Sequence, residues 1–394
     1  MSLSPFSKNS VADDPALAAQ QATLSAFFIP SFEGGGAEKV MVQIASRLAQ
    51  RGHSIHLVVA NDHGPCKKLV HENVKVFNLG RNSVTRSIPG LVSYVRSNRP
   101  AVVMSTMLHA NLALVISAFF FNSNTRLVAR EALPLSLEMH QSRKISLLTK
   151  VFYRRFDAFI SLTQCQQKDR HAILKSRESN KDWIIPNPVE LNQLVALSDE
   201  QPEKPLPDSF DNRPIIVACG RLSKQKGFDV LLRAFSETRK SVDCSLVILG
   251  EGDARASLEA LAADLEISTH LWMPGFLENP HPYVKRCAVF VLSSFSEGMP
   301  NALLQAYVLG KRCVATDCLC GPSEILAHPG LHRLVEVGNH VKMSLAIQEM
   351  LDTPEQADGH PDWSKHYDID EVCDKFSEAL QINPPRLIEN TRLQ

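Results

Sequence analysis

The segment VFVLSSFSEGMPNALLQAYVLGKRCVATDCLCGPSEIL, residues 289–326, carries the pattern that decides the fold. An apolar run of strand length (288–292) ends in small polar residues, and a proline after Met299 opens a helical pattern, where proline is well tolerated. Glu297 and Gly298 therefore stand between the end of a strand and the start of a helix. Free N–H groups and the helix dipole suit such a point to an anion. Taken alone, the stretch fits an ordinary strand-to-helix connection as well as a seat for a sugar phosphate, with Gln305 as a second polar group.

The same alternation of strand, loop and helix runs through the whole chain. The predicted strands are 24–30, 55–60, 74–78, 101–105, 126–129, 157–162, 183–186, 214–219, 245–249, 271–274, 288–292 and 333–335. Helical patterns such as 40–48, 88–96 and 228–239 lie between them. This order predicts an α/β protein with parallel, doubly wound sheets, whose ligands bind at the carboxyl ends of the strands.

The length of 394 residues exceeds one ordinary core, so two domains are expected. We assign a disordered lead to 1–20, a first domain to 21–195, a linker to the Pro- and charge-rich stretch 196–213, and a second domain to 214–365. Asn187, Pro188 and Val189 mark the expected hinge. A final amphipathic helix within 366–394 is expected to pack back on the first domain. Asp368 and Asp370 resemble an Asp-x-Asp metal motif, but an N-cap role suits Asp368 better.

The composition, 44% hydrophobic and 21% charged, is that of a globular protein. Residues 1–190 carry 23 Lys and Arg against 13 Asp and Glu, and the rest has the opposite excess. The first half is therefore expected to meet something anionic, a membrane surface or a phosphorylated acceptor. The nine cysteines lack metal-site spacing, and reduced thiols in a cytosolic protein are expected. The longest apolar run, 112–121, is too short to span a bilayer and predicts a buried helix.

The segment QSRKISLLTKVFYRRF, residues 141–156, predicts a basic amphipathic helix. Ile145, Leu148 and Phe152 fall on one side of it, and five Lys and Arg residues surround them. Two interpretations stand side by side. The helix either covers the core with a solvated face, or it attaches to anionic lipid.

Several candidate ligand groups stand at predicted strand ends. Gly35 and Gly36 precede a helix and would let a ligand approach the backbone closely, although their spacing matches neither the dinucleotide fingerprint nor the P-loop. Arg221 and Lys226 flank a loop that could hold a diphosphate without a metal, since Arg offers a forked contact and Lys a point charge. His109 follows another strand end.

Motifs in this order and spacing resemble those of the retaining, nucleotide-sugar-dependent glycosyltransferases of family 4, also called group 1. They are GGGAEK (34–39), IIPNPV (184–189), GRLSKQKG (220–227), LGEG (249–252), PGF (274–276), SFSEGMPNALLQA (294–306) and GPSEI (321–325). The resemblance extends from about Ser25 to Met350. It implies the GT-B fold, two Rossmann-like domains that face a cleft, with the acceptor on the first and the donor on the second.

The resemblance also implies roles for individual residues. Arg221 and Lys226 match the pair that holds the donor diphosphate and replaces a metal, so no metal or other cofactor is expected. Glu297 matches the residue that binds the hydroxyls of the transferred sugar, and His109 matches a histidine near that sugar. The implied donor-binding residues are Gly35, Gly36, Gly220, Gly252, Gly298, Met299, Pro300, Asn301 and Gln305.

Gln305 departs from the family, which has a second Glu at this position to bind the ribose hydroxyls. An amide still accepts a hydrogen bond but lacks the charge-assisted strength of a carboxylate. Weaker ribose binding is expected. The role of Glu131, which follows Arg130 at a strand end, stays open.

The resemblance implies transfer of a hexose or N-acetylhexosamine, from a UDP-sugar, to a glycan or lipid-linked acceptor in the synthesis of a bacterial surface polysaccharide. Nucleic acid is not an expected partner. The basic first half suits a cytoplasmic enzyme that is peripheral on the inner membrane. Two alternatives stay open: a UDP-sugar epimerase of the same fold, and a catalytically weak partner subunit marked by Gln305.

Overall fold

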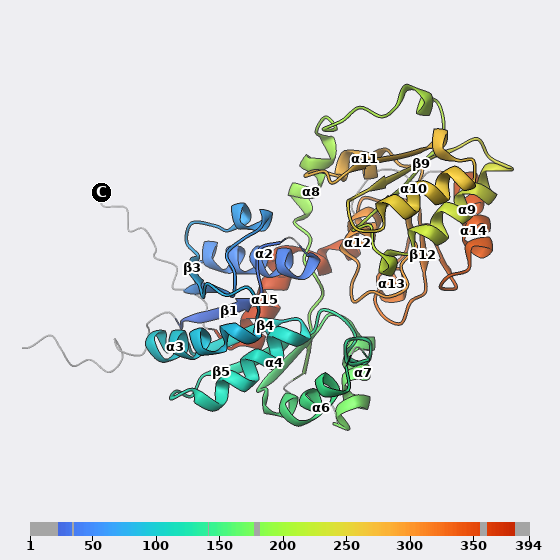
Figure 1. The fold of residues 1–394 in the computed structure, drawn as a ribbon. Coiled ribbons are helices and arrows are strands. Elements are labelled where there is room, and N and C mark those ends of the chain that lie inside the picture. The colour runs from blue at the N-terminus through green and yellow to red at the C-terminus, as the bar shows by residue number, and fades with distance from the viewer. Residues whose placement is uncertain (1–22, 34, 141, 177–181, 355–360, 383–394) are drawn as a thin grey trace, which may run out of the picture.

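A computed structural model describes residues 23–33, 35–140, 142–176, 182–354 and 361–382. It contains two parallel sheets, each with helices on both faces, in two domains that lie side by side (Figure 1). The predicted α/β class is confirmed. The predicted disordered lead, residues 1–20, lies outside the described residues, as does Gly34 of the glycine loop.

The first sheet has seven strands in the order β3-β2-β1-β4-β5-β6-β7. Its strands are β1 (Ser25–Ile29), β2 (Ile55–Val59), β3 (Lys75–Asn78), β4 (Val102–Thr106), β5 (Arg126–Arg130), β6 (Ala158–Ser161) and β7 (Asp182–Ile184). Its helices are α2 (Gly36–Gln50), α3 (Ile88–Asn98), α4 (Leu108–Ser117), α5 (Leu135–Met139), α6 (Arg143–Phe152) and α7 (Gln164–Leu174). Each neighbouring pair of strands is parallel, so all carboxyl ends meet at one edge.

The second sheet has six parallel strands in the order β10-β9-β8-β11-β12-β13. They are β8 (Ile215–Cys219), β9 (Ser245–Leu249), β10 (Leu271–Gly275), β11 (Val289–Leu292), β12 (Cys313–Thr316) and β13 (His332–Val335). The helices around it are α8 (Leu191–Asp199), α9 (Phe228–Arg239), α10 (Arg255–Asp264), α11 (His281–Arg286), α12 (Asn301–Val308), α13 (Pro322–Ile325) and α14 (His340–Asp352).

Burial on both faces explains why the central strands read as continuous apolar runs. In β1, Phe27 and Ile29 pack into the core on the α2 side, whereas Ala26 and Phe28 pack into the core on the α3 and α4 side. Successive side chains of a strand point to opposite faces, and helices cover both faces here. The central strands of the second sheet are divided between two cores in the same way.

The chain crosses between the domains earlier than the predicted linker. Ile185 belongs to a core of the first domain, and Val189 already belongs to a core of the second. The stretch from 191 to 199 forms α8, whose Leu194 is buried in the second-domain core. The predicted linker, 196–213, is therefore wrong at its beginning, because residues 196–199 still belong to α8. The chain crosses between the domains at residues 185–189.

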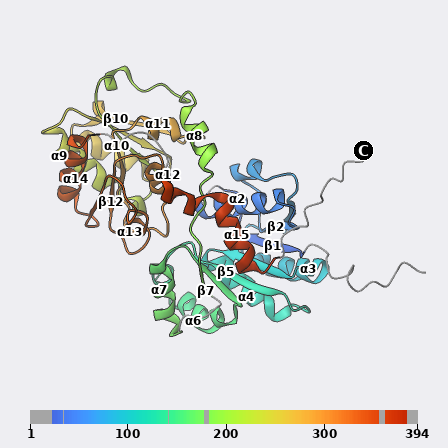
Figure 2. The ribbon, with the colours of Figure 1, turned by 180° about the vertical axis from the view of Figure 1, so that it is seen from behind.

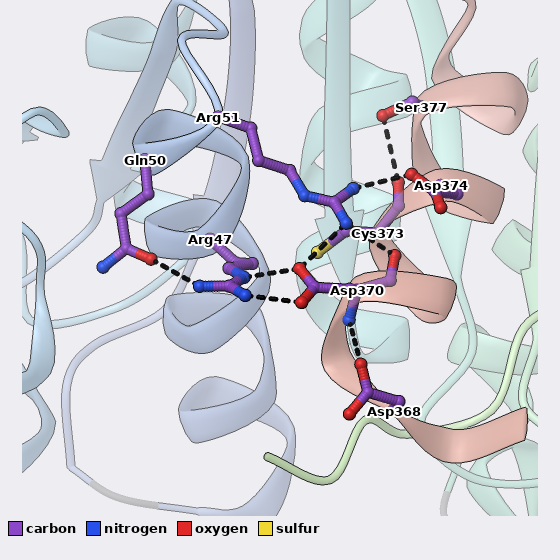
Figure 3. A network of polar contacts seen from close by, with 8 residues as sticks. All are labelled: Arg47, Gln50, Arg51, Asp368, Asp370, Cys373, Asp374 and Ser377. Atoms are coloured by element: carbon purple, nitrogen blue, oxygen red, sulfur yellow. Dashed lines mark hydrogen bonds and ion pairs between the residues drawn. The ribbon is translucent and has the colours of Figure 1, made fainter. Parts of the chain in front are cut away.

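The C-terminal helix α15 (Ile369–Leu380) returns to the first domain, as Figure 2 shows from behind. Its buried side adds Val372, Phe376 and others to the α2 core. Asp370 accepts hydrogen bonds from Arg47 of α2 and from Arg51, the C-cap of that helix (Figure 3). The Asp368 carboxylate accepts from the N–H of Asp370 at 2.9 Å, which confirms its N-cap role.

A disulfide joins Cys165, in the first turn of α7, to Cys320, which follows β12. This corrects the expectation that every thiol is reduced. The two cysteines are 155 residues apart in sequence, and only the meeting of the two domains makes them neighbours. The other seven cysteines form no disulfide.

The apolar run 112–121 is only partly the buried helix that was predicted. Helix α4 ends at Ser117, and a short 3-10 turn, η3 (Ala118–Phe120), follows with two exposed phenylalanines. No helix in the described part of the chain is long and apolar enough to cross a bilayer.

Candidate active site

Two loops at the carboxyl edge of the second sheet form one unit. They follow β8 and β11, which are neighbours in the sheet. The N–H of Phe295 donates to the Gln225 carbonyl at 2.8 Å, and the Ser293 hydroxyl donates to the Lys226 carbonyl at 2.8 Å. Gly227 has a φ of 60°, and a Cβ there would lie 2.2 Å from the Ser293 carbonyl oxygen, so only glycine fits. The 220–227 and 293–300 loops are therefore fixed against each other.

Two of the predicted site residues, Lys226 and Glu297, meet between these loops. Lys226 Nζ lies 2.6 Å from Glu297 Oε1, and the Ser294 hydroxyl donates to the same oxygen at 2.6 Å. The Glu297 side chain is 8% exposed and that of Lys226 22%. An ammonium group has three donors, so Lys226 keeps N–H groups for an incoming anion. The arrangement can offer a carboxylate and a cation to one ligand.

Arg221 makes no hydrogen bond or ion pair with Lys226 or Glu297 among the residues that the structure describes. Its side chain is exposed. Burial raises the pKa of Glu38 on α2, and the positive charge of Arg221 acts in the opposite direction. Arg221 is therefore within electrostatic reach of the first domain.

The glycine loop of the first domain faces the beginning of α12. Gly35 is the N-cap of α2, and a Cβ built on Gly36 would lie 3.4 Å from Asn301 Nδ2. Pro300 is the N-cap of α12, and Asn301 is its first residue. Two helix N-termini, one from each domain, thus approach each other, and both carry the partial positive charge that suits an anion.

The loop after β11 also touches the first domain directly. A Cβ on Gly298 would lie 1.9 Å from the carbonyl oxygen of Ala132, so the two backbones are packed with no room for a side chain. Met299 is buried beside it, and its carbonyl accepts from Asn187 Nδ2 at 3.2 Å.

Asn187 is the residue that joins the two halves of the site, and sequence reasoning assigned it only to the hinge. Its Nδ2 donates to Asn301 Oδ1 at 2.6 Å, and its Oδ1 accepts from Arg130 Nη2 at 2.5 Å. Arg130 is fully buried and also donates to Thr106 at 2.9 Å. The sequence does contain a pattern that indicates this network. Thr106, Arg130 and Asn187 each end or follow a strand of one parallel sheet, so they lie at the same edge.

Three further predicted residues, Gly220, Gly252 and Gln305, belong to the second domain. Gly220 and Gly252 follow β8 and β9, and the N–H of Gly220 donates to the Leu249 carbonyl at 2.9 Å. Gln305 is half-buried on α12, one turn beyond Asn301, and its side chain makes no hydrogen bond to the residues that the structure describes. The structure brings both glycines and Gln305 to the carboxyl edge of the second sheet.

His109 lies at the start of α4, where β4 ends. Desolvation lowers its pKa, which favours the neutral imidazole at neutral pH. Within the described ranges, no hydrogen bond joins His109 to the second domain. Its predicted place near the transferred sugar stays a prediction.

Glu131, whose role was open, is engaged inside the first domain. Its Oε2 accepts from Ser161 at 2.7 Å and from Arg170 Nε at 3.2 Å.

Among the described residues, no group of three or more His, Cys, Asp or Glu side chains is placed to hold a metal ion. The expectation of a metal-independent reaction stays a prediction.

Comparison with known proteins gives two family matches, one for each domain. Residues 34–193 match Glycosyltransferase Family 4, and residues 199–359 match Glycosyl transferases group 1. An uncharacterized glycosyltransferase of Methanocaldococcus jannaschii is 31% identical over 60% of this chain and 60% of its own length. The Campylobacter jejuni N-acetylgalactosamine-N,N'-diacetylbacillosaminyl-diphospho-undecaprenol 4-alpha-N-acetylgalactosaminyltransferase is 26% identical over 82% of this chain and 89% of its own.

Solved structures agree on the fold. The Anabaena protein HepE, in a complex with UDP and glucose, superposes with a TM-score of 0.73 at 18% identity over 91% of this chain and 99% of its own. At this identity the likeness shows the GT-B fold and nothing finer. With both domains matched by family descriptions and the two-sheet architecture in place, the chain belongs to the group 1 glycosyltransferases of family 4.

Proposed function

We propose that this chain is a retaining glycosyltransferase that moves a hexose or N-acetylhexosamine from a UDP-sugar to a lipid-linked or glycan acceptor. The observation that carries the proposal is the contact between Lys226 and Glu297 at 2.6 Å, beside the start of α12 and opposite the Gly35–Gly36 loop. A sugar diphosphate has hydroxyls at one end and negative charge at the other. A buried carboxylate, a cation and two helix N-termini in one place complement that shape.

The donor and acceptor classes draw support from relatives. The Campylobacter jejuni relative is named for transfer to a diphospho-undecaprenol acceptor, and two Rhizobium meliloti relatives are named for lipopolysaccharide core biosynthesis. HepE was solved with UDP-glucose as well as with UDP. An acceptor on a lipid diphosphate also suits the basic first half of this chain, and we place the enzyme on the cytoplasmic face of a membrane, in surface polysaccharide synthesis.

In the proposed reaction, the bond between the sugar C1 and the diphosphate oxygen breaks as an acceptor hydroxyl bonds to C1 on the same face. Lys226 and Arg221 stabilise the negative charge that gathers on the departing UDP, so no metal is required of the site. Glu297 accepts hydrogen bonds from sugar hydroxyls and orients the ring. The acceptor proton passes to an oxygen of the leaving phosphate, and the products are UDP and the glycosylated acceptor.

The test is a panel of UDP-, GDP- and ADP-sugars, read as the shift in melting temperature of the full chain, because a ligand of the native state stabilises it. We expect a shift with a UDP-sugar, followed by UDP release that depends on an added lipid-diphosphate acceptor and by retained anomeric configuration in the product. Conversion of the UDP-sugar to its epimer without any acceptor would point to an epimerase. No shift with any donor would reject the transferase.

A further inference from the structure

Helix α6 has apolar residues on two sides, and only one of them faces the core. Thr149 is buried, and Ile145 and Phe152 pack against the core of the first domain. On the outer side, Leu147 is 65% exposed and Val151 55%. Leu148, which the sequence placed with the buried residues, is also exposed, so that part of the prediction is wrong. An ordinary covering helix would present polar groups here.

The outward apolar stripe continues on the neighbouring turn η3. Phe119 and Phe120 are 50% and 55% exposed. The ring of Phe119 meets that of Phe152 edge to face, with centroids 5.6 Å apart, which connects the turn to α6. We call the five exposed side chains Phe119, Phe120, Leu147, Leu148 and Val151 the α6 face. Figures 1 and 2 show α6 on the outside of the first domain, away from the sheet of the second.

Positive charge surrounds the α6 face. Residues 140–156 contain five Lys and Arg and no Asp or Glu. Arg143, Lys144 and Lys150 are exposed, and the guanidinium of Arg155 lies over the Phe119 ring at 4.1 Å from its centroid. Arg96 of α3 donates to the Phe120 carbonyl and so adds positive charge beside η3.

We propose that the α6 face docks on an anionic lipid bilayer, with its apolar side chains in the interface and its basic side chains among the headgroups. Five large exposed apolar side chains on one helix and on a turn that contacts it mark an interaction surface. The charged residues of the 140–156 segment are all cations, which complements an anionic bilayer and not a neutral one, and interfacial helices combine these two features. The inference rests on the proposed lipid-linked acceptor for its biological purpose, and on exposure and charge for its evidence.

The test is co-sedimentation of the full chain with vesicles of phosphatidylcholine alone or with roughly 30 mol% phosphatidylglycerol. Two variants probe the surface: Leu147→Ser with Val151→Ser removes apolar area, and Lys144→Glu with Lys150→Glu reverses charge. The matched control is Val341→Ser with Leu345→Ser on α14, where two residues, also four apart on one helix, are 52% and 61% exposed. Melting temperature and circular dichroism confirm that each variant folds.

We expect the unmodified chain and the α14 control to bind the anionic vesicles, and each α6 variant to lose about tenfold or more in partitioning. High salt should weaken the binding that remains. No binding by the unmodified chain, an equal loss in the α14 control, or full binding by both α6 variants would overturn the proposal. So would a dimer in sedimentation velocity that only the Leu147 and Val151 substitutions dissociate. Transfer to a water-soluble acceptor should persist in the α6 variants, and its absence from the unmodified chain would instead count against the proposed function.

Discussion

Lys226 is the side chain on which the proposed chemistry depends most. We expect Lys226→Ala to lower kcat by about 10² to 10³, the range for loss of one group that stabilises transition-state charge. Stability should change much less, because the Lys226 side chain is partly open to water and Ser294 still donates to Glu297. Steady-state kinetics and thermal melting check both statements. Lys224→Ala, an exposed position in the same turn, is the control, and an unchanged rate for Lys226→Ala would remove this residue from the mechanism.

A substitution of Gln305 is expected to strengthen UDP binding rather than weaken it. Its side chain is half-buried on α12, with no hydrogen bond to other described residues that a substitution would break. We expect Gln305→Glu to tighten UDP binding by about three- to tenfold, since a charge-assisted bond to a ribose hydroxyl is stronger than that of an amide. Isothermal titration calorimetry measures the difference. Equal affinity for UDP would mean that this position does not contact the ribose.

The loop after β11 depends on the close approach of Gly298 to the first domain. The Cβ of an alanine there would meet the Ala132 carbonyl oxygen at 1.9 Å, and this backbone oxygen cannot turn away. We expect Gly298→Ala to lower the free energy of unfolding by about 1–3 kcal/mol, the usual cost of overpacking, and to lower the transfer rate. Gly90→Ala is the control, because its Cβ would meet only Leu79 at an ordinary 3.4 Å. Wild-type stability in Gly298→Ala would show that the domains do not meet at this point in solution.

A buried network ties β5, β6, β7 and α7 together and predicts a pH dependence. Arg170 lies between Glu131 and Asp182, at 3.2 and 2.8 Å. Burial raises the pKa of Glu131 from 4.5 to about 7, against the opposing charge of Arg170. The native state therefore keeps a proton that the unfolded chain releases, and stability declines as pH rises from about 4.5 to about 7.

We expect Glu131→Gln to flatten that decline without abolishing it. Burial raises the pKa of Glu138 to about 7 as well, so a second carboxyl contributes in the same direction. Urea unfolding at a series of pH values gives the slope for each variant. A slope equal to that of the unmodified chain would place the titration elsewhere.

Strands and helices with strong periodicity could be predicted from the sequence, and contacts between distant elements could not. The fully buried β1 and the loop before α12 have local signals, an apolar run and a proline after Gly298. Whether the outer apolar residues of α6 are covered depends on which elements lie beside it, and Leu148 was misplaced for that reason. The Asn187 contacts needed three strand ends and the second domain in place before Asn301 came within reach. The residue types at the site were therefore predictable, but their connections were not.

The whole molecule is held closed on one side of the domain boundary by α7 and α13. Both oxygens of the Glu324 carboxylate accept from α7, one from the N–H of Gln164 and one from that of Cys165, each at 2.9 Å. A carboxylate at a helix N-terminus is favoured by the free N–H groups and the dipole. The disulfide from Cys165 to Cys320 adds a covalent link at the same point, so the two domains cannot separate here while it is intact.

Reduction of this disulfide should loosen the molecule as a whole. A closed loop of this length stabilises a chain by about 5 kcal/mol in the chain-entropy model, so we expect a lower melting temperature after reduction and a larger radius of gyration in X-ray scattering. The double variant Cys165→Ser with Cys320→Ser should show both changes already and should not respond to reductant, which separates this bond from other effects of the reagent. Thiol titration of the denatured, unreduced chain decides whether the bond forms at all. Seven thiols match the structure, whereas nine would mean that both cysteines stay reduced and that Glu324 alone connects α13 to α7.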